Sequence, residues 1–295
     1  MEKVVYLLRP NQFFVLLYMA LLNQQCILLQ ELYHITHSTK EMKDLYLTGF
    51  SCLSFFLFLF SSCHNTDKEE GFISIFDGKS FSGWKGDSTY WRIENGNLVG
   101  IVTPETILKR NSFIIWQDGT SKDFELKLEY RITKEGNSGI NYRSEEIEEL
   151  PFALGGYQFD LDGQNHYTGQ NYEERGRTTL AYRGQSVILE SLPDSLAIMP
   201  KSTFIKNNAW TRSVVIDSVS NLAELDYHIK ENDWNSCHLV VKGNKMQHYV
   251  NGILMSEVID NDEKNRKTEG RIGVQVHVGP PMKVEFRNIR LKVYQ

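Results

Sequence analysis

The sequence predicts an all-β domain over residues 71–295, a β-sandwich or jelly roll with few short helices. The first observation is 124–132, where every even position is apolar and every odd one charged, the period of a strand with one buried and one wet face. The second is a pair of two-residue links, Gly243-Asn244 and Asn251-Gly252, which are typical of hairpin turns because Gly and Asn tolerate positive φ. Helical periodicity is unconvincing except in an ambiguous stretch, 220–229. Many short strands at regular spacing favour a sandwich over a parallel α/β sheet.

The remaining strands follow in the C-terminal half. The two turns join three apolar-rich runs into a predicted β-meander: 237–242, 245–250 and 253–258. Residues 271–278 alternate again, and 284–294 form a last predicted strand. Within that strand the apolar phase slips between Phe286 and Ile289, which predicts a bulge near Asn288.

One long segment, 189–210, interrupts the series of strands. It shows no clear period and contains Pro193 and Pro200. We expect a loop that crosses the sheet, and long loops in compact domains are often functional.

Residues 1–62 read as a targeting segment and not as part of the domain. From Met42, an alternative true start, a short n-region leads into a Phe/Leu/Ser-rich stretch of signal-peptide length, which ends in small residues before Cys63. This resembles a bacterial lipoprotein signal, with Cys63 as the lipidated residue and 63–70 as a polar tether. We therefore expect a lipoprotein anchored to a membrane of a bacterial cell envelope, in the periplasm or at the outer membrane. The alternative is an extra N-terminal anchor helix.

Charge and cysteine content narrow the kinds of partner. The net charge of −5 argues against nucleic acid, whose binding needs concentrated Lys and Arg. Cys26, Cys52 and Cys63 precede the predicted domain, so Cys237 stands alone in it. The domain therefore has no disulfide framework and no cysteine metal cluster.

Assigning faces to the strands predicts a polar face. It draws side chains from three strands: Asn141 and Arg143; Gln158, Asp160 and Asp162; Gln275 and His277. If these strands share a sheet, the face carries carboxylates, an arginine, amides and an imidazole, the mixture that a sugar with many hydroxyls requires. The alternative is an ordinary solvated outer face.

Ordered motifs along the whole domain resemble one known family. They are Gly71-Phe72, Phe76-Asp77-Gly78-Lys79, Gly83-Trp84, Trp91-Arg92-Ile93-Glu94-Asn95-Gly96, Asp123-Phe124-Glu125-Leu126, Asn137-Ser138-Gly139-Ile140, Gly156-Tyr157-Gln158 with Asp160, Trp234-Asn235, Val250-Asn251-Gly252, Gly270-Arg271-Ile272 and Phe286-Arg287-Asn288-Ile289. The set resembles the 3-keto-disaccharide hydrolase family, formerly a domain of unknown function, whose fold is a concanavalin A-like sandwich. The chain resembles a branch with Tyr-Gln-x-Asp followed by two tyrosine motifs, Tyr167-Thr168-Gly169 and Tyr172-Glu173-Glu174-Arg175.

The resemblance implies a glycoside-cleaving enzyme whose substrate is already oxidised to a ketone at C3. The ketone acidifies the C2 proton, so that a base can remove it and the C1 substituent can leave, with or without later addition of water. Among the residues, His277 is the first choice for the base, and Asp160 and Glu174 are the candidate carboxylates. The substrate-binding candidates are Arg143, to steady the enediolate, Gln158 and Gln275, to orient the ring, and Tyr172, Arg175 and Asn137. A divalent metal cation could polarise the ketone, with His277, Asp160 and Glu174 as acceptable ligands, but no diagnostic metal spacing occurs.

Two other functions fit the same residues. A conventional glycosidase could use Asp160 and Asp162, which stand about 6.5–7 Å apart on one strand face. The second alternative is a non-catalytic protein that captures glycans at the cell surface. Such a protein would bind unoxidised glycans without turnover.

Overall fold

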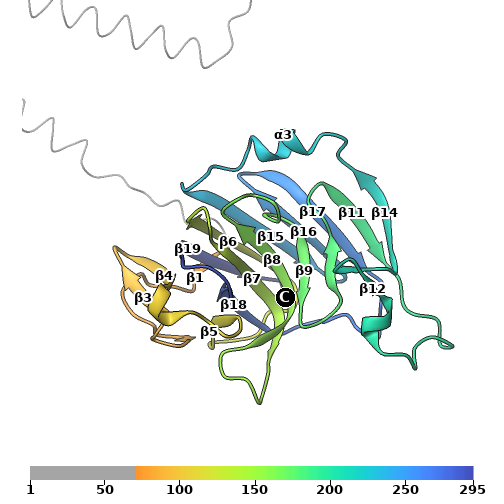
Figure 1. Ribbon diagram of the computed structural model, residues 1–295, viewed down its shortest axis with the longest axis horizontal. Helices are drawn as coiled ribbons and strands as arrows, with labels where there is room; N and C mark the ends of the chain where they lie inside the picture. The colour runs from red at the N-terminus through yellow and green to blue at the C-terminus, as the bar shows by residue number, and fades with distance from the viewer. Residues whose placement is uncertain (1–70, 295) are drawn as a thin grey trace, which may run out of the picture. The chain divides into compact units, whose positions relative to one another are not determined.

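The computed structural model describes residues 71–294. The predicted targeting segment 1–62, Met42, the lipidation site Cys63 and the tether 63–70 lie outside these residues. Over 71–294, no helix is long and apolar enough to cross a membrane. Two β-sheets face each other as two layers (Figure 1), which confirms the predicted all-β sandwich.

The first layer, sheet A, has ten strands. Their spatial order is β14 (Ser213–Ser218), β11 (Gln185–Leu189), β17 (Ile253–Asp260), β16 (Lys245–Val250), β15 (Asn235–Lys242), β6 (Phe124–Ile132), β19 (Met282–Val293), β4 (Asn97–Val102) and β3 (Trp91–Glu94), and β1 (Ile73–Ser74) also pairs with β19. The predicted meander is β15–β16–β17, with positive φ at Gly243, Asn251 and Gly252 in its turns. The bulge near Asn288 is confirmed, because the β19–β6 register shifts between Arg287 and Arg290.

The second layer, sheet B, has nine strands. Their order is β12 (Ile205–Lys206), β13 (Ala209–Trp210), β10 (Thr178–Ala181), β9 (Asn171–Glu174), β8 (Leu154–Asp162), β7 (Asn137–Glu146), β18 (Arg271–Val276), β5 (Ser112–Trp116) and β2 (Trp84–Lys85). Helical structure within 71–294 is limited to α3 (Leu222–Asp226) and two 3-10 turns, Pro104–Thr106 and Lys201–Phe204. The predicted loop 189–210 therefore contains some regular secondary structure, namely one 3-10 turn and the hairpin β12–β13 at its end.

The core lies between the two sheets. Strand β6 alternates buried and half-buried residues as its sequence predicts, and its Phe124 ring packs edge-on against Tyr142 of sheet B with 5.9 Å between centroids. Strand β8 sends Tyr157, Phe159 and Leu161 into this core. Because side chains alternate along a strand, Gln158 and Asp160 point to the opposite, outer face of sheet B. That face carries the candidate site.

Candidate functional site

The outer face of sheet B bears a pocket of about 560 Å³. Its lining is polar and comes from strands β7 to β10, from the hairpin β12–β13 and from the ends of β5 and β18: Asn111, Asn137, Gln158, Asp160, Tyr167, Gln170, Tyr172, Glu174, Arg175, Thr179, Tyr182, Asn207, Asn208 and His277. Seven of the predicted site residues therefore meet in one pocket: His277, Asp160, Glu174, Gln158, Tyr172, Arg175 and Asn137.

Asp160 lies at the floor of the pocket, held by two amides. Nε2 of Gln158 donates to one carboxylate oxygen at 2.6 Å and Nε2 of Gln170 donates to the other at 2.5 Å. Burial raises the pKa of Asp160 to about 7, although the bonds from Gln170 and Gln158 act in the opposite direction. Gly139 stands opposite Asp160 in the β7–β8 register, and a Cβ there would lie 2.4 Å from Cδ of Gln158. Glycine is therefore required at 139 for Gln158 to reach Asp160.

Strand β9 presents two residues to the pocket and two to the interior. Tyr172 and Glu174 line the pocket, and one oxygen of Glu174 accepts a hydrogen bond from Asn111 at 3.3 Å. Burial raises the pKa of Glu174, and burial with the nearby carboxylates raises that of Tyr172 to about 12. The Tyr172 hydroxyl therefore keeps its proton near neutral pH and can donate a hydrogen bond.

The other face of β9 is anchored in the sandwich. Asn171 donates to the hydroxyl of Tyr142, which lies 2.9 Å from Nε2 of the buried His248 of sheet A. Burial lowers the pKa of His248 to about 3, so this histidine is neutral and structural.

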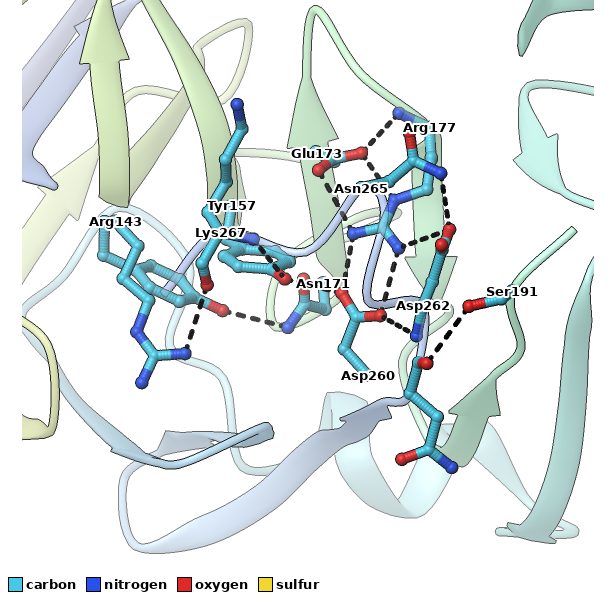
Figure 2. A network of polar contacts seen from close by, with 12 residues as sticks. Arg143, Tyr157, Asn171, Glu173, Arg177, Ser191, Asp260, Asp262, Asn265 and Lys267 are labelled. Carbon is cyan, nitrogen blue, oxygen red and sulfur yellow. Dashed lines mark hydrogen bonds and ion pairs between the residues drawn. The ribbon is translucent and has the colours of Figure 1, made fainter. Parts of the chain in front are cut away.

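Glu173, between the two pocket residues, meets a fully buried arginine, Arg177 (Figure 2). The guanidinium also pairs with Asp260, the last residue of β17 in sheet A, at 2.7 Å and with Asp262, two residues farther on, at 3.4 Å. Burial opposes the charge on Arg177, but Glu173 and Asp260 outweigh it and raise the pKa. This cluster of one arginine and three carboxylates fixes β9 to the opposite sheet.

His277 follows β18 at the pocket's rim and is half-buried. Its Nδ1 lies 2.5 Å from the carbonyl oxygen of Val278. A carbonyl only accepts, so Nδ1 carries the proton and Nε2 has a free lone pair. Burial lowers the pKa of His277, which keeps the imidazole neutral near pH 7.

The three predicted metal ligands share one pocket but are not gathered into one group. Within the described part of the chain, no three His, Cys, Asp or Glu side chains come close enough together to hold an ion. His277, Asp160 and Glu174 line one pocket without converging, and both oxygens of Asp160 already accept amide hydrogen bonds.

Arg143 is not in the pocket, and its predicted face is wrong. The β7–β8 register shifts between Tyr142 and Glu145, and Arg143 has a φ of 44°, so the strand's alternation breaks there. The buried guanidinium instead pairs with Asp123 at 3.0 Å and donates to backbone carbonyls, one of which is Gly243 in the β15–β16 turn of sheet A. Arg143 thus ties the two sheets together, and Arg175 is the arginine that lines the pocket.

Two other predicted residues lie behind the pocket wall. Gln275 is fully buried and donates to Oε1 of Gln158 at 3.1 Å, so it supports a pocket residue without lining the pocket. Asp162 is buried under the following loop, where its backbone N–H donates to Thr168 at 3.0 Å. A glycosidase built on Asp160 and Asp162 therefore lacks its second carboxylate in the pocket.

Several pocket residues were not predicted. Asn111 and Gln170 carry no signal in the sequence beyond their residue type. Asn207 and Asn208 belong to the segment 189–210, whose length and lack of period mark it as a functional loop without indicating which residues matter. Tyr167 belongs to the motif Tyr167-Thr168-Gly169, which does not by itself indicate a binding role.

Residues 71–292 match the family model described as a 3-keto-alpha-glucoside-1,2-lyase-like domain. The chain belongs to this family of carbohydrate-acting proteins. It is similar to the 3-keto-disaccharide hydrolase of Bacteroides thetaiotaomicron, with 27% identity over 76% of this chain and 79% of that protein.

Solved structures also resemble this family member. A candidate glycosyl hydrolase from Parabacteroides distasonis shares 21% identity over 79% of this chain and 99% of its own, with a TM-score of 0.48. A carbohydrate-binding module from Bacillus subtilis shares 15% identity over 71% of this chain and 95% of its own, with a TM-score of 0.43.

Proposed function

We propose that this protein cleaves 3-keto-glycosides by removing the C2 proton and expelling the C1 substituent. The observation that supports this best is that a neutral imidazole and a carboxyl group with a pKa of about 7 line the same pocket. This combination gives a base and an acid that are both in their active forms near neutral pH.

In the first step, Nε2 of His277 takes the proton from C2. The electron pair of the C2–H bond forms a C2=C3 double bond, and the C3 oxygen takes up the negative charge as an enediolate. Tyr172 is the neutral donor and Arg175 the cation of the pocket that can stabilise this oxygen.

In the second step, the C3 carbonyl re-forms and a C1=C2 double bond appears as the C1–O bond breaks. Asp160 in its protonated form gives its proton to the leaving oxygen, so that a neutral alcohol departs. Water that adds to C1 and C2 of the unsaturated product would complete a net hydrolysis. Glu174, with one oxygen free of described hydrogen bonds, is the group that can deprotonate that water.

One assay tests the proposal against its alternatives. The purified protein is incubated with a glycoside and with its 3-keto derivative, each with added divalent metal and with chelator, and free aglycone is measured. Release only from the keto compound is the expected result, and the chelator arm reports whether a divalent cation takes part. Release from the unoxidised glycoside would indicate a conventional glycosidase. Binding of that glycoside without any release would indicate a capture protein.

The pH dependence of kcat/KM follows from the two pKa shifts. His277 must be neutral, so activity rises with pH through a pKa below the usual histidine value. Asp160 must be protonated, so activity falls as pH rises through about 7. We expect a bell-shaped profile for the keto substrate with its optimum just below neutral pH. An alkaline limb that is absent up to about pH 9 would remove Asp160 from the role of acid.

We also propose that the chain is anchored to a membrane of the cell envelope through a lipid on Cys63. The support is the order of n-region, apolar stretch, small residues and cysteine in 42–63. The full chain expressed in a bacterium is expected to partition into the detergent phase of Triton X-114, and Cys63→Ala to move it to the aqueous phase. Equal partitioning of both forms would contradict lipidation at this residue.

A further inference from the structure

The pocket reaches well beyond the groups assigned to the chemistry. Its lining extends past β9 and β10 to the tip of the hairpin β12–β13, the outermost strands of sheet B. Those outer residues have no role in proton transfer. Their arrangement indicates what else the pocket binds.

Strand registers measure this extension. Gln158 of β8 stands opposite Tyr172 of β9, Tyr172 opposite Thr179 of β10, and Thr179 opposite Ala209 of β13. Neighbouring strands lie about 4.7–4.9 Å apart, so three intervals separate Gln158 from Ala209 by roughly 14 Å. His277 lies still farther along, on the opposite side of Gln158, because β18 is separated from β8 by β7. One sugar ring held between Asp160 and His277 is too short to reach the hairpin.

The hairpin tip is fixed in place by its backbone. Asn207 and Asn208 both have positive φ, 50° and 57°, which Asn tolerates in tight turns. The carbonyl of Asn208 accepts from the backbone N–H of Thr179 at 3.2 Å, which attaches the tip to β10. Each asparagine has an amide that offers both donors and an acceptor, and no described hydrogen bond occupies either one.

An aromatic side chain lines the same edge of the pocket, beyond Thr179 along β10, whereas the hairpin tip lies before Ala209 in this parallel pair. Tyr182 follows β10 and is 43% exposed although it lines the pocket. A tyrosine ring gives a flat apolar surface with a polar tip, and such a ring can cover the C–H face of a pyranose while amides bind the hydroxyls at its edge.

We propose that Tyr182, Asn207 and Asn208 form a distal sugar subsite that binds a further ring of an oligosaccharide substrate, on the leaving-group side of the cleaved bond. This deepens the proposed function and rests on it for the direction of the chain. The substrate class it predicts is a glycoside of three or more rings, as opposed to one with a small aglycone.

Calorimetric titration with gluco-oligosaccharides of one to four rings, in α-1,4 and β-1,4 linkage, tests the subsite. We expect affinity to rise with ring number in one of the two series. Tyr182→Ala should reduce the gain from added rings by about tenfold, the value of a good aromatic contact. Asn208→Gly, which tolerates the positive φ and removes the side chain with its amide, should reduce it in the same direction. Tyr227→Ala is the matched control, since Tyr227 is 88% exposed and outside the pocket.

The outcomes separate the subsite from the reaction. Affinity that does not depend on ring number in either series, or an equal response of the Tyr182 and Tyr227 variants, would overturn the subsite. Cleavage of 3-keto substrates is measured in parallel. Length-dependent binding that needs Tyr182, found without cleavage, would support the subsite and overturn the reaction. Cleavage without length dependence would do the reverse.

Discussion

Replacing His277 by alanine is expected to lower kcat for a 3-keto-glycoside by about 10²–10⁴-fold, the usual contribution of a general base. The reason is local. Nε2 of His277 is the free lone pair of a neutral imidazole at the pocket, and its Nδ1–H is held by the carbonyl of Val278. The buried His248 cannot replace it, because its ring nitrogens face Tyr142 and the carbonyl of Gln170 between the sheets.

The measurement needs a control for folding and a readout specific to the base. His228→Ala removes an exposed histidine outside the pocket and should leave kcat within about twofold, as expected for a surface substitution. Added imidazole should partly restore the rate of the His277→Ala protein. A His277→Ala rate equal to that of the parent would remove His277 from the role of base.

The second large effect concerns stability. Arg177→Met should lower the free energy of unfolding by about 3–5 kcal/mol, because it leaves Glu173, Asp260 and Asp262 buried without their cation. Arg177 is fully buried, so solvent does not screen these pairs. For a domain of this size the change corresponds to a fall in Tm of roughly 6–20 °C. Calorimetric or circular-dichroism melting measures it.

A matched surface substitution shows whether burial is the cause. Lys264→Met also removes a cation from an ion pair, but its partner Asp194 is almost fully exposed, so we expect a change below about 1 kcal/mol. Equal melting temperatures for the two variants would mean that the buried cluster does not stabilise the sandwich.

The same cluster links stability to the site. Glu173 lies between Tyr172 and Glu174, and its bond to Arg177 fixes the strand that carries both pocket residues. Arg177→Met should therefore also weaken catalysis at temperatures where the protein is still folded. The cluster thus positions two pocket residues although neither Glu173 nor Arg177 lines the pocket itself.

Local patterns determined the architecture and the direction of individual side chains. Strict alternation identified β6, the Gly-Asn and Asn-Gly links identified the meander, and the phase slip identified the bulge in β19. Alternation also directed Gln158 and Asp160 outward, and both line the pocket. These strand positions and side-chain directions depend on residues close together in the chain, so the two-residue period of a strand is enough to predict them.

Only the tertiary structure decided which outward residues meet in the pocket. A register shift sends Arg143 to the turn at Gly243, and a loop covers Asp162, although both continue the polar face in sequence. Asn207 and Asn208 join the pocket because β13 pairs with β10, where Ala209 stands opposite Thr179. Neither the residue pattern nor the period of these two segments predicts that pairing. The sequence by itself thus determined the sandwich and the faces of regular strands such as β6 and β8, since these follow from local periodicity. Register, bulges and loop cover decided the pocket, since they depend on contacts between segments far apart in the chain.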